Sequence, residues 1–206
     1  MHVPHDHAAL LVIDMQRAFL DPDAARARSG GDVTPLMAAI PGCTALVELA
    51  RAADVPVIFT RYVYSAGMAD FGPARTERAR RRRAAGALAP DDPGIEIVDV
   101  LAPRRGEVVI DKARASAFYG TRLEPVLTGT GIRNLVICGV TTNICVESTA
   151  RDAGQRDYGT FVVRDAVAEL TPERHENALA AIDWYFGTTC AVADVAGSWP
   201  AAPGRS

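Results

Sequence analysis

Short apolar runs recur along the chain, and each one stops at a polar residue or a turn. The first run covers Ala8–Ile13 and ends directly before Asp14. Runs of this length without polar alternation are typical of strands that are buried on both faces of a sheet. The pattern therefore predicts six strands, at Ala8–Ile13, Pro56–Thr60, Glu107–Ile110, Asn134–Cys138, Thr160–Val163 and Cys190–Val195.

Helical patterns lie between these runs. In Pro41–Ala53, for example, Leu46, Leu49 and Ala50 fall on one face of a helix. Alternating strands and helices indicate an α/β fold with a mainly parallel sheet and right-handed crossovers. In such folds ligands bind at the edge of the sheet where the carboxyl ends of the strands gather. The other predicted helices are Thr121–Thr128, Asn143–Ala153 and Pro172–Phe186.

Two segments interrupt the alternation. Tyr62–Gly94 is long for a loop, which predicts a lid or an oligomer contact. It contains Arg78 and Arg80–Arg83, which form either a nucleic-acid patch or a solvated helix or loop. We favour the solvated segment, because acidic residues nearby offset the charge and no aromatic residues interleave with the arginines. The tail Gly197–Ser206 is rich in Pro, Gly and Ala and is predicted to be flexible.

Composition narrows the class of protein. A chain of 206 residues fits one domain, 1–206, with a core at 8–195. The net charge of −3 gives no reason to expect nucleic-acid or membrane partners. The cysteines, Cys43, Cys138, Cys145 and Cys190, show no CxxC spacing, and the N-terminus reads as a first strand and not as a signal peptide. We therefore expect reduced thiols in a cytoplasmic enzyme.

Lysine and histidine are both scarce. Lys112 is the single lysine among 22 basic residues, and His175 is the one histidine outside the first seven residues. A zinc site built from two or three histidines of the folded body is therefore excluded. A catalytic triad with a histidine base would have to use His175 or the N-terminal His2, His5 or His7.

Familiar active-site motifs are also missing. The chain contains no GxSxG, HExxH or GxxxxGK[ST] sequence. Gly129-Thr-Gly131 resembles the start of a dinucleotide fingerprint, but it precedes a predicted strand, so a helix C-cap and turn is the favoured interpretation.

Three chemically reactive residues stand at the ends of predicted strands: Asp14, Lys112 and Cys145. Taken singly, they are equally well explained as a helix cap, a surface charge and a small apolar residue. If the sheet is parallel, however, all three reach one edge of it and together form a complete nucleophilic site.

The expected chemistry is that of an activated thiol. A free thiol has a pKa of about 8.5, and a helix N-terminus and a nearby cation are expected to lower the pKa of Cys145. Asp14 would take the thiol proton, and Lys112 would hold the carboxylate in place. The thiolate would attack a carbonyl carbon, with the backbone amides of Thr141 and Cys145 as candidate donors to the oxyanion. Gly139 would permit the tight turn before them.

At these residues the sequence resembles the isochorismatase-like cysteine hydrolases. The matching pieces are LLVIDMQRAF, DKARASAFYGTRLEPVL, LVICGVTTNICVESTARDA and FVVRDAV, in order from about residue 8 to 195. The resemblance implies a three-layer αβα sandwich around a mainly parallel six-stranded sheet, an Asp14–Lys112–Cys145 triad, and a cis peptide between Val140 and Thr141 that would turn the Thr141 amide towards the oxyanion. It also implies a homo-oligomer, a dimer or a tetramer.

Differences within the family bear on the substrate. Nicotinamidases carry a metal site with a DxH element between the triad Asp and Lys, and here Met15–Asp111 contains no histidine. We therefore expect a metal-independent enzyme without a cofactor. Isochorismatases that cleave a vinyl ether lack the cysteine, so Cys145 argues against that activity. The stretches SAFYGTRLEPVL and AIDWYFG resemble the biuret, ureidoacrylate and N-carbamoylsarcosine hydrolase branch, which implies a small carbamoyl or ureido substrate.

Several further residues are candidates for substrate binding: Gln16, Phe19, Phe118, Tyr119 and Val140. Gln16 is equally well explained as a solvent-facing loop residue, and Phe19 as a core residue. Arg61 or Arg114 are candidates for binding an acidic group of the substrate. Trp184 and Phe186 are expected to pack a helix or a subunit interface.

Two other functions compete with the hydrolase. One is a catalytically silent binding module on the same scaffold, which would have no reason to keep Asp14, Lys112 and Cys145. The other is a redox-sensing thiol, which normally needs a second cysteine nearby. Cys138 is close in sequence, but its place in an apolar strand predicts a core residue.

Overall fold

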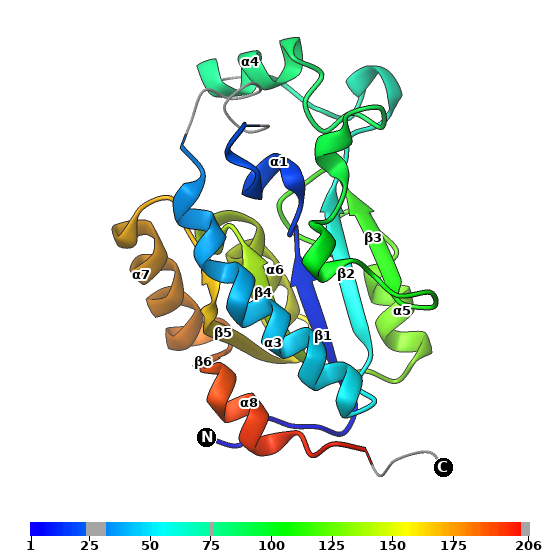
Figure 1. Cartoon of the computed structure of the whole chain (residues 1–206), viewed down its shortest axis with the longest axis vertical. Helices are drawn as coiled ribbons and strands as arrows, with labels where there is room; N and C mark the ends of the chain where they lie inside the picture. Colours follow the sequence, from blue (N-terminus) through cyan, green and yellow to red (C-terminus); the bar gives the residue numbers. More distant parts are fainter. Residues whose placement is uncertain (24–31, 75, 203–206) are drawn as a thin grey trace.

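A six-stranded parallel sheet forms the centre of the molecule. The computed structural model describes residues 1–23, 32–74 and 76–202. In this part of the chain the strand order is β3-β2-β1-β4-β5-β6, and every neighbouring pair is parallel (Figure 1). The strands are β1 (Ala8–Ile13), β2 (Val57–Tyr62), β3 (Val108–Lys112), β4 (Asn134–Val140), β5 (Gly159–Ala168) and β6 (Thr188–Cys190).

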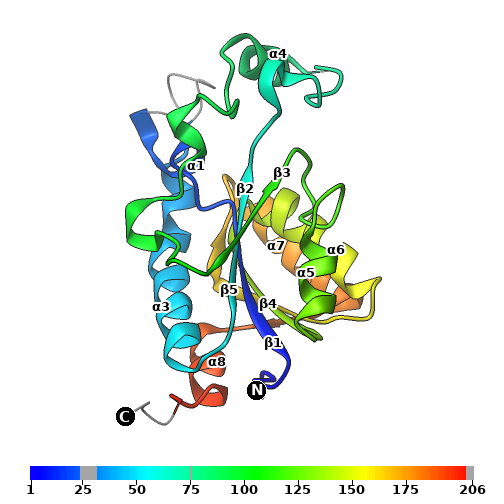
Figure 2. The ribbon, with the colours of Figure 1, turned by 90° about the vertical axis from the view of Figure 1, so that its right-hand side faces the viewer.

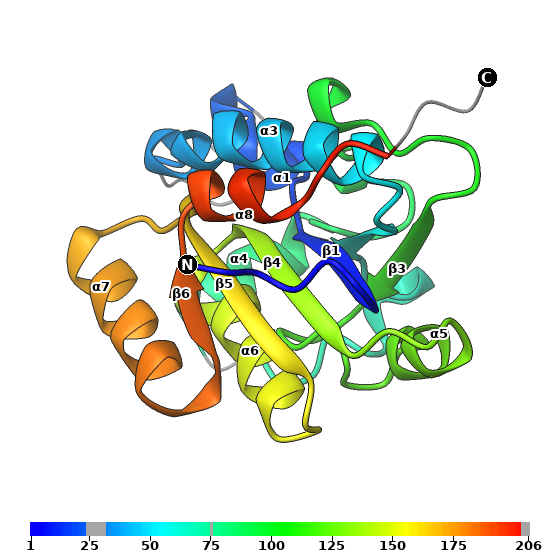
Figure 3. The same ribbon diagram turned by 90° about the horizontal axis from the view of Figure 1, so that it is seen from below.

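Helices cover both faces of the sheet. The α-helices are α1 (Arg17–Leu20), α3 (Ala39–Ala52), α4 (Glu77–Ala84), α5 (Leu123–Gly129), α6 (Glu147–Gly154), α7 (Pro172–Ala181) and α8 (Val192–Ser198). Figures 2 and 3 show α3 and α8 on one face and α5, α6 and α7 on the other. This arrangement confirms the predicted three-layer αβα sandwich.

Short helical turns complete the described chain. Four are 3₁₀ turns, at Thr34–Ala38, Ala66–Met68, Pro93–Ile95 and Asp99–Leu101, and two are π turns, η5 (Thr142–Val146) and η6 (Ile182–Phe186). Among the described residues, every helix is too short or too polar to cross a bilayer.

The first strand shows why the sequence is apolar without interruption. All six residues of β1 are buried. Leu10 and Val12 pack into the cluster under α3, whereas Ala9, Leu11 and Ile13 pack into the cluster on the opposite face. Because successive side chains of a strand point to opposite faces, a strand covered by helices on both sides needs apolar residues at every position.

At its carboxyl end β1 lies very close to β4. Gly139 pairs with Ile13, and its φ of +114° lies in a region that side chains rarely adopt. A Cβ atom at this position would stand 2.1 Å from the carbonyl oxygen of Ile13. Glycine is therefore required here by the close approach of β1, and Gly139 lies within β4 and not in the tight turn predicted at this residue.

The last predicted strand is wrong beyond Cys190. Strand β6 is short, and residues from Val192 onward form α8. The carboxylate of Asp194 accepts a hydrogen bond of 2.9 Å from the Ala191 amide, which satisfies a backbone donor at the start of this helix. Val195 packs into the core cluster under α3, so its apolar character reflects a helix face and not a strand.

Other boundaries shift by a few residues. Strands β2, β4 and β5 run past their predicted ends, and β3 runs past its predicted end at Ile110 to Lys112. Helix α5 ends at Gly129, and Gly131 follows with a φ of +72°, which confirms the predicted C-cap and turn. In the predicted tail, Trp199 is buried and its indole nitrogen donates to the Pro4 carbonyl oxygen; residues 203–206 of that tail lie outside the described residues.

The long segment after β2 has a hydrophobic cluster of its own. We call residues 63–74 and 76–95 the cap. Its cluster contains Tyr64, Met68, Leu88, Ala89 and Ile95. Helix α4 carries the arginine run, and Glu77 in its first turn pairs with Arg80 and Arg81. The favoured interpretation, a helix whose charge is partly offset by a neighbouring acid, is thus confirmed for these two arginines.

Replacing Gly139 should destabilise the protein strongly. In Gly139→Ala the new methyl group would collide with the β1 backbone, so the free energy of unfolding should fall by more than about 2 kcal/mol. Chemical denaturation followed by circular dichroism measures the change. The matched control is Gly129→Ala, where a Cβ meets no atom within 4 Å. Equal stabilities of the two variants would contradict the close approach.

Candidate active site

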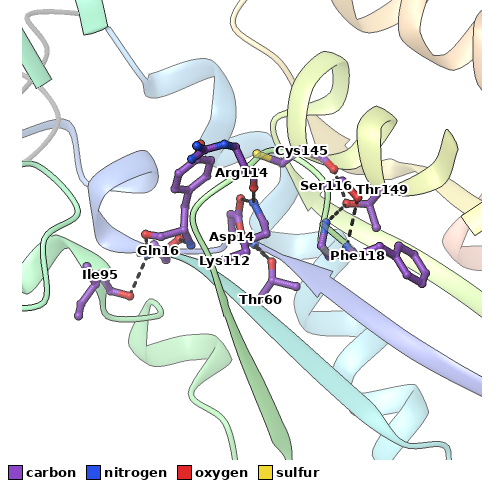
Figure 4. Close-up of polar contacts among 12 residues, drawn as sticks. Asp14, Gln16, Thr60, Ile95, Lys112, Arg114, Ser116, Phe118, Cys145 and Thr149 are labelled. Atoms are coloured by element: carbon purple, nitrogen blue, oxygen red, sulfur yellow. Dashed lines mark hydrogen bonds and ion pairs between the residues drawn. The ribbon is translucent and has the colours of Figure 1, made fainter. Parts of the chain in front are cut away.

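Asp14, Lys112 and Cys145 meet at the carboxyl edge of the sheet (Figure 4). Asp14 follows β1, Lys112 ends β3, and Cys145 lies in η5, directly after β4. The ammonium of Lys112 donates to Oδ2 of Asp14 at 2.7 Å, and neither side chain is exposed. The charges of both groups act on the Cys145 thiol. The structure therefore brings the three residues together as the strand ends predicted; their catalytic roles stay a prediction.

The Asp14 carboxylate is held at both oxygens. The hydroxyl of Thr60, on the neighbouring strand β2, donates to Oδ1 at 2.6 Å. The same hydroxyl oxygen accepts the Asp14 amide at 3.2 Å. Asp14 has a φ of +50°, a left-handed conformation that Asp tolerates better than most residues. The chain thus turns sharply at the end of β1 and directs the carboxylate towards Lys112.

The Lys112 ammonium is enclosed on several sides. Besides Asp14, it donates to the Arg114 carbonyl oxygen at 3.1 Å and lies 4.4 Å from the centre of the Tyr62 ring. Burial alone would lower the pKa of this ammonium, but the charge of Asp14, the thiol of Cys145 and its hydrogen bonds outweigh burial, so the pKa is raised. Lys112 therefore stays charged.

Cys145 does not have the lowered pKa that we expected from its position. Burial raises the pKa of the thiol, and the negative charge of Asp14 raises it further, while Lys112 opposes both effects only in part. The expectation of a lowered pKa for this thiol is therefore wrong. The thiol stays protonated and needs a base, and Asp14 is the nearby group of that kind.

Cys145 sits in the first turn of a helical segment, where η5 continues into α6. The amides of Ile144 and Val146 in this turn donate to the Thr141 carbonyl oxygen at 3.2 Å. The amides of Thr141 and Cys145 stay the predicted oxyanion donors. The peptide between Val140 and Thr141 is cis, as the resemblance implied. Thr149 fixes the turn, because its hydroxyl donates to the Cys145 carbonyl oxygen at 2.7 Å and accepts the Ala117 amide at 3.0 Å. The loop after Lys112 is thereby tied to the helix that carries Cys145.

A cavity of about 210 Å³ opens in front of the thiol. Drug-sized ligands occupy pockets of roughly 300–1,000 Å³, so this cavity suits a small substrate. Of the residues predicted to contact substrate or oxyanion, Phe19, Val140, Thr141 and Cys145 line it.

Three other predicted binding residues make different contacts. Gln16 is buried; its side-chain amide donates to the carbonyl oxygens of Tyr62 and Ile95, and its carbonyl oxygen accepts the Tyr62 amide. It is therefore not the solvent-facing residue considered above, because it joins the end of β2 to the cap. Phe118 packs in the same core cluster as Cys145, and Tyr119 is 69 % exposed. A role of these three residues in substrate binding stays a prediction.

The geometry supports neither a histidine base for Cys145 nor a redox pair of Cys145 and Cys138. The ring of His175 contacts the Thr142 hydroxyl at 3.0 Å, one turn away from the thiol. Cys138 interacts with Cys43 in the cluster under α3, whereas Cys145 belongs to the cluster on the other face. Within the described ranges, no group of three or more His, Cys, Asp and Glu side chains is placed to hold a metal ion.

Sequence reasoning missed several residues around the site. Thr60 had a readable signal, since it is a hydroxyl residue at the end of an otherwise apolar strand. Tyr62, Thr149, Glu169 and Arg82 had none, because their roles depend on which elements fold together. Arg82 lines the cavity although it belongs to the arginine run of α4.

Known proteins share this sequence pattern and architecture. The model of the Isochorismatase domain matches residues 8–194. This chain belongs to the isochorismatase family. A family relative, the ureidoacrylate amidohydrolase of Azorhizobium caulinodans, is 34% identical over 206 residues, which covers 94% of this chain and 91% of the relative. The family resemblance stated from the sequence is therefore confirmed.

Solved structures of family proteins agree. A cysteine hydrolase from Pseudomonas syringae pv. phaseolicola aligns with a TM-score of 0.83 and 28% identity, covering 96% of this chain and 94% of that chain. The N-carbamoylsarcosine amidase of Thermoplasma acidophilum aligns with a TM-score of 0.68 and 26% identity, covering 90% of this chain and 96% of that chain.

The raised pKa of Cys145 predicts how its alkylation depends on pH. Because the thiol is protonated at neutral pH, the rate with iodoacetamide should climb about tenfold per pH unit and still be rising at about pH 9. Mass spectrometry of the labelled protein over a pH series measures this rate. Cys145→Ala supplies the background from the three other thiols. A rate that levels off below neutral pH would show instead that the thiolate is the resting form.

Proposed function

We propose that this protein hydrolyses a C–N bond of a small ureido or carbamoyl compound through a thioester on Cys145. The observation that carries the proposal is the buried Asp14–Lys112 ion pair next to a thiol that lines a small cavity. A carboxylate, an ammonium and a thiol in this order supply a base, a fixed charge and a nucleophile. The family relatives support the reaction class, since they include a ureidoacrylate amidohydrolase and an N-carbamoylsarcosine amidase.

The first half of the reaction forms the thioester. The Cys145 thiol gives its proton to the Asp14 carboxylate as its sulfur attacks the carbonyl carbon of the substrate. Lys112 stabilises the negative charge that develops on the sulfur, and the backbone amides of Thr141 and Cys145 donate to the oxyanion. The C–N bond then breaks, and the leaving nitrogen takes the proton from Asp14.

The second half releases the acyl group. Water gives a proton to Asp14 and attacks the thioester carbonyl, and the carbon–sulfur bond breaks. The sulfur takes the proton back from Asp14, which restores the thiol and the carboxylate. One substrate molecule and one water molecule thus yield an acid and an amine; when the acyl group is carbamoyl, the acid is carbamic acid.

Further properties belong to the same proposal. The mechanism uses side chains and backbone amides alone, so we propose an enzyme without metal or cofactor. The family resemblance supports a homo-oligomer, and Trp184 and Tyr185, both strongly exposed on η6, are candidates for its contact surface. Phe186 instead packs under the guanidinium of Arg151. Four free cysteines support a cytoplasmic location, where disulfides are rare.

Cys145→Ala should abolish turnover and leave the fold intact. Ammonia release over a panel of biuret, ureidoacrylate, N-carbamoylsarcosine, maleamate and nicotinamide measures activity, and acid-quenched wild-type enzyme should carry the acyl group on Cys145 by mass spectrometry. Cys190→Ala, which removes a thiol from the end of β6, is the control and should stay active. Undiminished turnover by Cys145→Ala would rule out the thioester, and a wild-type protein inert on every substrate would favour the silent binding module.

Thr60→Val should slow catalysis without removing any triad member. The variant loses the hydroxyl that fixes Oδ1 of Asp14, and a hydrogen bond to a charged group is worth about 1.5–3 kcal/mol, so kcat should fall roughly ten- to a hundredfold. Thr60→Ser keeps the hydroxyl and should recover most of kcat. Steady-state kinetics on the best substrate of the panel decide the matter, and equal kcat in Thr60→Val and wild type would exclude this positioning role.

A further inference from the structure

The cap contributes one described residue to the lining of the cavity, the positively charged Arg82. Arg82 projects from α4, which lies above α1 beyond the carboxyl ends of the strands (Figure 1). Its side chain is half-buried, and its guanidinium lies 5.8 Å from the centre of the Phe19 ring, another lining residue. A guanidinium stacked on an aromatic ring is restrained in orientation and partly shielded from water.

No carboxylate of the described residues pairs with Arg82. Its neighbours Arg80 and Arg81 pair with Glu77, and Arg83 lies over the Phe71 ring. Arg61 and Arg114, the arginines expected from the sequence to bind an acidic group, are engaged elsewhere. Arg61 pairs with Asp111 at 2.8 Å, and Arg114 donates to backbone carbonyl oxygens.

The remaining charges of the cavity leave it positive. Glu169 also lines it, but its two carboxylate oxygens accept the backbone amides of Asn143 and Leu170. Arg174 also lines the cavity and is exposed, so water screens its charge. The Asp14–Lys112 pair contributes no net charge. The cavity is thus lined by Arg82 and Arg174 and by the carboxylate of Glu169, which backbone amides already hold. The excess of positive charge favours an anion.

We propose that Arg82 is the specificity-determining residue that selects substrates carrying a carboxylate at the end remote from the scissile carbonyl. This inference rests on the proposed function and narrows its substrate class to ureido or carbamoyl acids. A guanidinium matches a carboxylate with two parallel N–H···O bonds, and such a pair gains strength where water is partly excluded. Cys145 and Arg82 line the same cavity of about 210 Å³, which is the arrangement that contact with the two ends of one short acyclic substrate requires.

The kinetic test compares a substrate pair that differs only in charge: ureidoacrylate and its neutral carboxamide. Arg82→Met should lower kcat/KM for the acid about ten- to a hundredfold and for the amide less than about twofold, because only the acid loses a charged hydrogen bond. Arg82→Lys should recover part of the loss. Arg81→Met is the matched control on the same helix and should change neither value. An equal loss on both substrates, or a wild-type preference for the amide, would overturn the assignment.

A second measurement is independent of turnover. Iodoacetate and iodoacetamide alkylate the same thiol and differ in charge, so the ratio of their rates at Cys145 reports the anion preference of the cavity. Arg82→Met should lower this ratio several-fold, and Arg81→Met should not. If the wild type hydrolyses none of the panel but the ratio still falls, the proposed function fails while the role of Arg82 stands. An unchanged ratio would refute that role even in an active enzyme.

Discussion

The buried ion pair between Asp14 and Lys112 is the interaction on which the rest of the site depends. Two charges removed from water lose several kcal/mol of hydration each, and their attraction compensates only with good geometry and further hydrogen bonds. Thr60 supplies one bond to the carboxylate, and the Arg114 carbonyl oxygen accepts one from the ammonium. Strand β2 lies between the two strands that carry the pair, so the order of the sheet fixes its geometry.

The sequence was sufficient to predict the sheet and the meeting of the three reactive residues. Strands buried on both faces are apolar at every position, so the local pattern identifies them without knowledge of their neighbours. In a parallel sheet the carboxyl ends share one edge, which places Asp14, Lys112 and Cys145 together. The same argument explains why Thr60, near the carboxyl end of β2, completes the group.

Other features depend on contacts that no local pattern encodes. The stretch after Cys190 is as apolar as a strand, yet Asp194 starts a helix there and Val195 packs on the core under α3. The thiol of Cys145 was expected to be acidic from its helix position and its cation. Burial of the thiol and the negative charge of Asp14 raise its pKa instead. Arg82 reaches the cavity only because the cap folds back over the sheet edge.

The cap has a hydrophobic cluster separate from the two that hold the sheet. Phe19 packs against both the cap cluster and the cluster under α3, and Tyr62 packs against both the cap cluster and the cluster on the opposite face. Among the described residues that line the cavity, Arg82 is the one that the cap contributes, and it belongs to none of these clusters. A substitution at Arg82 therefore changes the cavity without removing a side chain from the clusters that hold the sheet. The charge that faces the substrate can thus change at this position while Asp14, Lys112 and Cys145 keep their places at the edge of the sheet.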